Sequence, residues 1–164
     1  MKINIILISI FYFSSCSSNS IDPTGTYNLE SETEIRNGDT YGYSGEIRVK
    51  KLADDYIVLS LYVCRGAPSY NVGLVDDTIK MENNHSVLKC DMPEIDQKGE
   101  LHFYFKKDGI EVKEKHLEFN EFCTFGHAVH ADGFYKIKSR KIPSTTSLNP
   151  HHSNTLRTSN KRLA

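Results

Sequence analysis

The chain has 164 residues, with 20 basic and 21 acidic side chains and a formal net charge of −1. Residues 16–138 hold 14 of the basic and all 21 of the acidic side chains, a net charge of −7, while residues 139–164 hold five basic side chains and no acidic one. This balance argues against a nucleic-acid-binding domain, which needs a basic face, and permits a cationic partner. The length suits one domain with a single modest core.

The first twenty residues have the layout of an export signal. Lys2 precedes the apolar run Ile5–Phe13, which is shorter than the roughly 20 residues of a membrane-spanning helix. The run ends in Phe13-Ser14-Ser15-Cys16. These residues resemble the cleavage box of bacterial lipoproteins, with Phe13 where that family has Leu. The resemblance implies cleavage before Cys16 and a diacylglyceryl group on its thiol, where each buried methylene of chains such as palmitate contributes about 0.8 kcal/mol of membrane binding.

The lipoprotein resemblance implies a place in the cell envelope and an organisation of the chain. We expect anchoring to a membrane, with the outer membrane favoured, and a domain that faces the periplasm or the cell surface. The expected segments are a signal peptide at 1–15, a polar tether at 16–24, a β-domain at 25–138 and a disordered basic tail at 139–164. An ordinary secreted protein that is cut nearby, with Cys16 incidental, is the alternative.

Short apolar segments separated by turn residues fill the expected domain. Residues 43–52 alternate, with Ile47 and Val49 on one face, whereas residues 56–64 are apolar on both faces. Asp108-Gly109 is a hairpin signal. Strands are predicted at residues 25–30, 43–52, 56–64, 77–82, 86–90, 100–106, 110–115 and 133–138. Residues 115–122 could form a single helical turn.

This pattern predicts an all-β fold, an antiparallel meander of about eight strands. Such sheets remove their free edges by closing into a barrel or stacking as a sandwich, and we expect a small barrel. The stretch PTGTYNL, residues 23–29, resembles the Gly-aromatic opening strand of lipocalin-like barrels, with Tyr27 in place of the family's Trp.

Three cysteines follow Cys16, at positions 64, 90 and 123. Because an exported chain meets an oxidising compartment, one disulfide is expected, and three pairings are open. Cys90–Cys123 is favoured, since both residues end strand-like segments next to turns. Closing that loop would stabilise the fold by about 4 kcal/mol. Cys64 ends an apolar strand and is expected to be a small buried side chain.

The densest group of chemically active residues lies at 123–132. Cys123, His127, His130 and Asp132 could ligate zinc or copper. A cysteine nucleophile with a histidine base is a second possibility. The structural alternative is a Gly-containing loop that bends into the last strand. We expect no catalysis and no cofactor. A metal or redox site at 123–132 is kept as an alternative function.

Two loops have the composition of a recognition surface. The first is CRGAPSYNVG, with Arg65, Pro68, Tyr70 and Asn71, and the second is NGDTYGYSG, with Tyr41 and Tyr43. Tyrosine supplies contact area at low entropic cost and arginine supplies a forked donor. If both loops lie at one end of the barrel, their side chains form an aromatic patch. The alternative is that the tyrosines pack inward.

The leading hypothesis is therefore a non-enzymatic, lipid-anchored domain that binds a partner protein. In size, anchor, disulfide potential and charge the chain resembles periplasmic lysozyme inhibitors, which implies inhibition of a cationic wall-degrading enzyme. A carrier of a small apolar ligand is the alternative, with Val58 and Tyr62 lining a cavity. The carrier hypothesis fails if large side chains fill the interior, and those expected to do so are Leu59, Leu61, Phe103 and Phe105.

Overall fold

A computed structural model describes residues 20–92, 97–116 and 125–144. Within them the regular structure is entirely β. The strands are β1 (Gly25–Leu29), β2 (Glu34–Arg36), β3 (Asp39–Lys51), β4 (Tyr56–Gly66), β5 (Val72–Glu82), β6 (His85–Met92), β7 (Gln97–Phe105), β8 (Gly109–His116) and β9 (Gly133–Ser139). The helical turn expected at 115–122 falls mostly outside these residues, and its first two residues belong to β8.

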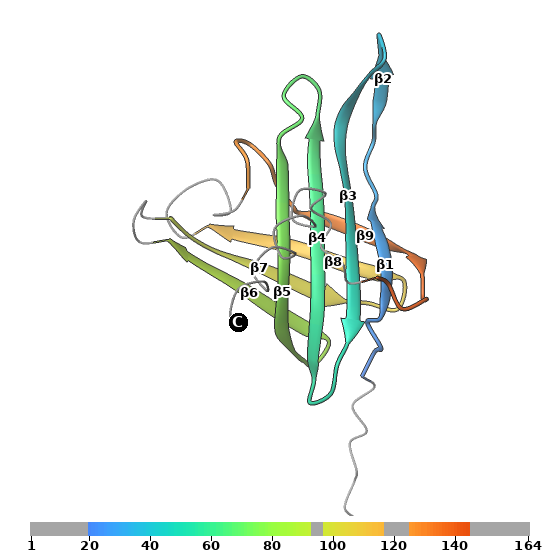
Figure 1. The fold of residues 1–164 in the computed structure, drawn as a ribbon, viewed down its shortest axis with the longest axis vertical. Helices are drawn as coiled ribbons and strands as arrows, with labels where there is room; N and C mark the ends of the chain where they lie inside the picture. The colour runs from blue at the N-terminus through green and yellow to red at the C-terminus, as the bar shows by residue number, and fades with distance from the viewer. Residues whose placement is uncertain (1–19, 93–96, 117–124, 145–164) are drawn as a thin grey trace, which may run out of the picture.

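The strands form one antiparallel barrel (Figure 1). Their order is β1-β9-β8-β7-β6-β5-β4-β3-β2, and a further pairing of β1 with β3 closes a ring of eight strands. β2 lies outside the ring and pairs with the start of β3. The predicted all-β meander is thus confirmed, and the barrel is the form it takes.

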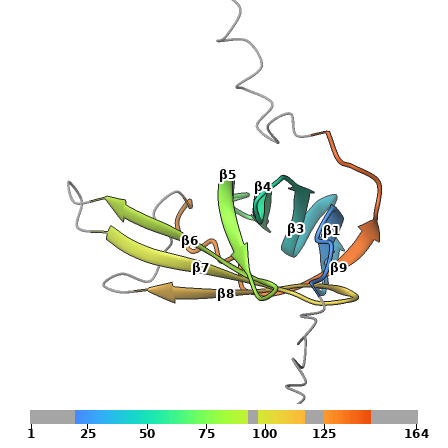
Figure 2. The same cartoon turned by 90° about the horizontal axis from the view of Figure 1, so that it is seen from below.

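The barrel is flattened, so that two groups of strands face each other. β3, β4 and β5 run across β6, β7 and β8, which lie behind them in Figure 1 and below them in Figure 2. β5 and β6 pair at only two positions next to their turn and then diverge. The apolar core lies between the two groups of strands.

Alternation along the strands builds this core as predicted. Ile47 and Val49 of β3 are fully buried, as are Leu59 and Leu61 of β4, and they join Phe103 of β7 in one cluster. The cluster consists of Tyr27, Ile47, Val49, Ile57, Leu59, Leu61, Val63, Val75, Ile79, Met81, Leu101, Phe103, Phe105, Ile110, Val112, Phe125, Val129, Ala131 and Tyr135. Large side chains therefore fill the barrel from both groups of strands.

The outer face of β4 corrects one prediction. Val58 and Tyr62, expected to line a cavity, alternate with Leu59, Leu61 and Val63, which are fully buried in the core. Because successive side chains of a strand point to opposite faces, Val58 and Tyr62 lie on the outer face, where they are half-buried.

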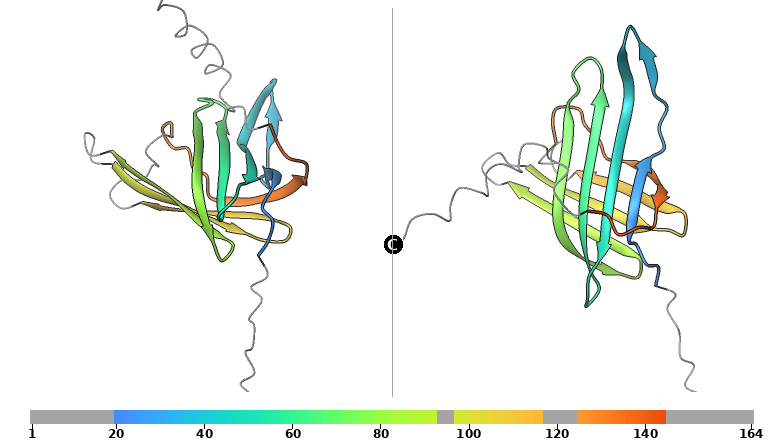
Figure 3. Two further views of the ribbon diagram at one scale, coloured as in Figure 1. Left: turned by 60° about the horizontal axis from the view of Figure 1, so that its bottom comes forward. Right: turned by 45° about the vertical axis from the view of Figure 1, so that its right-hand side comes forward.

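β2 and the first part of β3 form an arm that extends beyond the barrel (Figure 3). Residues 37–45 were predicted to be a loop, but Asn37 and Gly38 have φ values of 54° and 89° and make a two-residue hairpin turn. This turn folds Glu34–Arg36 back onto Asp39–Tyr41. The strand β3 is consequently longer than the alternation alone predicted.

The described chain begins at the end of the barrel opposite the arm, as Figures 1 and 3 show. There the backbone amide of Ile21 donates to Asn84 Oδ1 at 2.7 Å. Arg140 contacts the same region, donating to the carbonyl oxygens of Asp22 (2.9 Å) and Lys107 (2.8 Å). The ordered domain therefore extends past residue 138, where the disordered tail was expected to begin. No helix among the described residues is long and apolar enough to cross a membrane.

Candidate functional site

The two predicted recognition loops meet at the arm end of the barrel. The Ala67 amide donates to the Thr40 carbonyl oxygen at 2.7 Å. The Tyr70 hydroxyl donates to Asp39 Oδ1 at 2.8 Å and accepts from the Thr40 amide at 3.3 Å. We call the surface made by Tyr41, Arg65, Pro68, Tyr70 and Asn71 the tip surface. The two loops thus lie at the same end of the barrel, which is the condition that the aromatic patch required, and the binding role of these residues stays a prediction.

Tyr70 and Pro68 are the outermost residues of the tip surface. Tyr70 is 45% exposed and has a positive φ of 50°, so the turn presents its ring while Asp39 holds its hydroxyl. The hydrogen bond to Asp39 raises the pKa of Tyr70. The Arg36 guanidinium lies over the ring of half-buried Tyr41, 5.5 Å from the centroid. Contacts within the domain thus hold both aromatic rings in place, and an ordered surface of this kind would lose little entropy on binding.

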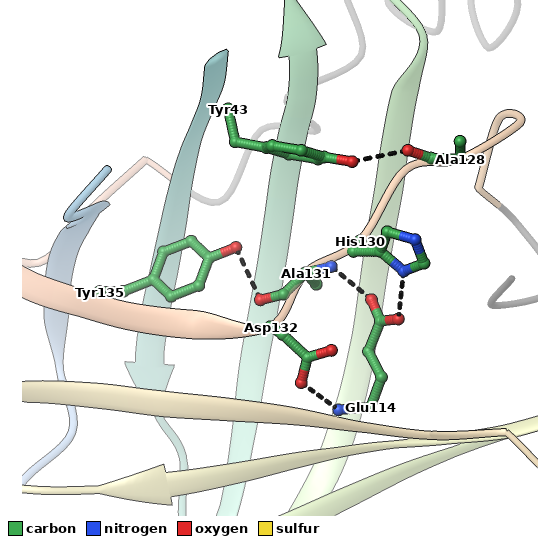
Figure 4. A network of polar contacts seen from close by, with 7 residues as sticks. All are labelled: Tyr43, Glu114, Ala128, His130, Ala131, Asp132 and Tyr135. Atoms are coloured by element: carbon green, nitrogen blue, oxygen red, sulfur yellow. Dashed lines mark hydrogen bonds and ion pairs between the residues drawn. The ribbon is translucent and has the colours of Figure 1, made fainter. Parts of the chain in front are cut away.

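Tyr43 does not belong to the tip surface, which corrects its predicted role. Its hydroxyl donates to the Ala128 carbonyl oxygen at 2.6 Å, its ring packs against the core, and burial raises its pKa (Figure 4). Asn71 has a partly structural role, because its amide donates to the His127 carbonyl oxygen at 2.8 Å. Both side chains fasten the segment that contains residues 127 and 128.

That segment, residues 125–132, which we call the strap, fills the place where β5 and β6 diverge. Phe125 bridges to Gly73 of β5, and the Gly126 amide donates to the Val72 carbonyl oxygen at 2.9 Å. Val129 and Ala131 are fully buried in the core. The structural reading of this region, a loop that bends into the last strand, describes the strap.

A carboxylate on β8 attaches the strap to the barrel (Figure 4). The Glu114 side chain is 1% exposed, and its two oxygens accept hydrogen bonds from the Ala131 amide and from His130 Nδ1, the latter at 3.2 Å. In return the Glu114 amide donates to Asp132 Oδ1 at 2.8 Å. The Tyr135 hydroxyl donates to the Ala131 carbonyl oxygen at 3.1 Å, and burial raises the pKa of this tyrosine.

Two of the predicted metal ligands hold the strap to β8. His130 and Asp132 both contact Glu114, whereas His127 is exposed and offers its backbone oxygen to Asn71. In the part of the chain that the structure describes, no three His, Cys, Asp or Glu side chains are grouped as metal ligands. Cys123 lies outside the described residues, so its predicted roles as a metal ligand or nucleophile stay predictions.

The cysteines give one result. Cys64 is free and buried, with its sulfur accepting from the Gly66 amide at 3.4 Å. Its predicted character as a small buried side chain is confirmed. The pairing of Cys90 with Cys123 stays a prediction, because the second residue lies outside the described residues.

A row of polar residues on the outer face of β6 and β7 was missed by sequence reasoning. Glu100 Oε2 lies 2.9 Å from His102 Nε2, and His102 Nδ1 lies 3.1 Å from His85 Nε2. His85 stacks on Tyr104, with ring centroids 4.5 Å apart. His102 is buried although it points outward. Burial lowers the pKa of His85, as do the nearby His102 and Lys115. The register of β6 against β7 brings the two histidines together, and this register cannot be read from the sequence.

The arm beside the tip surface is acidic. Residues 30–42 carry four carboxylates and a single guanidinium, that of Arg36. A hollow of about 320 Å³ runs along the base of this arm and is lined by Glu32, Thr33, Glu34, Tyr41 and Gly42. The aromatic tip surface thus lies next to a region of negative charge, a combination that suits a positively charged partner.

Comparison with known proteins gives no relative for this chain: no family model, no curated protein and no solved structure matches it.

Proposed function

We propose that the protein is a lipid-anchored lipoprotein of the bacterial cell envelope whose β-domain binds a partner protein through the tip surface. The observation that carries the proposal is the placement of the two ends of the barrel. The described chain begins at Ser20 at one end of the barrel, on the side of the proposed tether to Cys16, while the exposed Tyr70 bonds to Asp39 of the arm, which lies at the other end. A domain tethered in this way presents the tip surface away from the membrane.

The proposed partner is a cationic enzyme that degrades the cell wall, and the protein acts as its inhibitor. The supporting features are the acidic arm, the net charge of −7 over residues 16–138 and the rigid tyrosines of the tip surface. Complementary charge speeds encounter, and buried aromatic side chains supply most of the binding free energy at such interfaces. The proposed mechanism is steric and needs neither catalysis nor a cofactor.

The carrier alternative is not proposed, because the interior is filled. Leu59, Leu61 and Phe103 are fully buried and Phe105 is 4% exposed, all in one cluster. A ligand inside the barrel would have to displace these side chains. The carrier hypothesis required an interior that they do not fill.

An inhibition assay tests the proposed partner class. The chain from Ser17 onward, which keeps every described residue, is added at micromolar concentration to lysozymes degrading cell-wall suspensions. We expect inhibition of at least one enzyme and its loss in Tyr70→Ala. Tyr56→Ala is the matched control, because Tyr56 is 42% exposed but lies at the start of β4, at the barrel end opposite the arm. Failure to inhibit any lysozyme removes this partner class.

A labelling experiment tests the anchor separately. Cells that make the full chain are grown with radioactive palmitate, and the protein is recovered from the membrane fraction. We expect label in the wild type and none in Cys16→Ala. Equal labelling of both forms, or no label in either, contradicts the proposed lipid anchor.

A further inference from the structure

The arm carries a strand edge that faces away from the barrel. Within the described residues, β2 pairs with β3 along one side, in the register Glu34↔Tyr41, Ile35↔Thr40 and Arg36↔Asp39. In a two-residue hairpin the pair that flanks the turn exchanges both hydrogen bonds, and the next pair exchanges none. The amide and carbonyl groups of Ile35 therefore point away from β3, toward solvent.

The side chains of this edge are unusual for an exposed strand. Ile35 is 75% exposed, more than any other large hydrophobic residue in the described ranges. On the opposite face Arg36 and Glu34 form an ion pair of 2.5 Å, with side chains 62% and 59% exposed. Short exposed edges are usually protected by charge alone, whereas this one places an apolar residue between two opposite charges.

This sequence is complementary to itself. If two β2 edges meet in antiparallel orientation about a two-fold axis at Ile35, the outward amide and carbonyl groups of the two Ile35 residues bond to each other. The same register places Glu34 opposite Arg36 of the second copy, and Arg36 opposite Glu34 of that copy. Opposite charges directly across a strand pair are favourable and like charges are not. A two-fold contact uses one patch on both copies.

We propose that the arm is a self-association site, at which two copies of this chain join through their β2 edges to form a sheet that continues from one arm into the other. The arm projects beyond the other strands of the barrel (Figure 3), which leaves its outer edge accessible to a second copy. β4 pairs on the other side of β3, so the part of the tip surface that the β4–β5 loop carries stays open in such a dimer. The proposal does not rest on the proposed partner.

Three residues on each side give a weak dimer, with a dissociation constant on the order of 0.1–1 mM in solution. Tethering raises the effective concentration of two copies into a similar range, so an anchored pair could associate while a free pair mostly would not. The solution experiment must therefore reach high protein concentration.

Sedimentation velocity of the chain from Ser17, over concentrations up to about 1 mM, measures the association. We expect a concentration-dependent dimer. Glu34→Arg and Arg36→Glu each place like charges opposite each other and should weaken dimerisation about tenfold. The double variant E34R/R36E restores opposite charges and should recover the wild-type constant. A monomer at every concentration, or a double variant no better than the singles, overturns the proposal.

A backbone variant gives an independent readout. Ile35→Pro removes the outward amide and leaves the β2–β3 hydrogen bonds intact, because that amide makes none of them. It should abolish the dimer, while Ile35→Thr, which keeps the amide, should retain part of it. Circular dichroism confirms that both variants are folded. Dimerisation of Ile35→Pro at the wild-type level contradicts pairing through this edge.

Discussion

At the scale of single residues, Glu114 has the most demanding environment. Its carboxylate is almost fully buried and accepts from two donors of the strap, Ala131 N and His130 Nδ1. In Glu114→Gln the amide nitrogen replaces one acceptor and leaves one donor without a partner, which costs about 1–3 kcal/mol of unfolding free energy. Urea denaturation measures the loss.

The control for Glu114 lies on the same strand. Glu111 is on the outer face of β8, where its side chain is 31% exposed and pairs with Lys106 and Lys113. Glu111→Gln should change stability by less than about 1 kcal/mol, since exposed ion pairs contribute little. Equal losses of unfolding free energy in the two variants would show that the burial of Glu114 does not increase its contribution to stability.

His85 gives the row on β6 and β7 a predictable pH dependence. Its pKa is lowered in the folded state by burial and by the charges of His102 and Lys115. Between the folded pKa and the ordinary value near 6.5, the unfolded chain binds more protons. The free energy of unfolding should therefore fall as the pH drops below about 6.5, and this contribution should level off below the folded pKa.

The other groups that face His85 are fixed by strand register. Glu100 and Tyr104 lie on β7 beside His102, and Lys89 lies on β6. His85→Gln removes the titration of this group only, so it should lose less stability than the wild type between pH 7.5 and pH 5. Matching pH profiles for wild type and His85→Gln would refute the assignment.

At the scale of elements, the strap depends on one close approach. A Cβ atom at Gly73 would lie 2.5 Å from the Phe125 ring, so only glycine leaves room for that ring against β5. Gly73→Ala should destabilise the protein by about 1–3 kcal/mol through overpacking. Thermal or urea unfolding gives the value.

A double-mutant cycle shows whether the Phe125 ring is the cause. Phe125→Ala removes the ring, and the added methyl group of Gly73→Ala then has space. The two changes should be strongly non-additive, with the double variant close to Phe125→Ala alone. Additive losses would mean that Gly73 is required for another reason.

Sequence alone predicted the elements that carry alternation and turn residues. The inward faces of β3, β7 and β8 followed from Ile47, Phe103 and Val112, each at a period of two. β2 could not be predicted in this way, because three residues with one apolar side chain show no period. Its existence depends on the turn at Asn37-Gly38, an Asn-Gly hairpin signal that stands within the stretch predicted to be a loop.

The sequence predicted which residues the candidate site contains, but not which of their side chains lie at the surface and which pack inward. Tyr41, Tyr43 and Tyr70 are alike in the sequence, yet Tyr43 turns inward to the strap while Tyr70 stays at the surface. Strand register decides this, and register depends on contacts between distant residues. The strap itself was recognisable as a loop, but its position between β5 and β6 depends on Gly73 and Phe125 meeting across 52 residues of chain.

At the scale of the whole molecule, the two ends of the barrel differ. The core separates the end at which the described chain begins from the end that carries the tip surface. Large side chains are buried together between the described strands, so we treat the barrel as a support for the tip surface and not as a ligand carrier. In the proposed function, activity depends on the partner protein that meets the tip surface.

Site-specific photo-crosslinking in cells that make the full chain tests this most directly. A photoreactive phenylalanine analogue replaces Tyr70 in one form and Tyr56 in another, two tyrosines of similar exposure at opposite ends of the barrel. The account predicts a discrete heavier product with a second protein from position 70 and none from position 56. Products of equal yield from both positions, or from neither, would contradict partner binding through the tip surface.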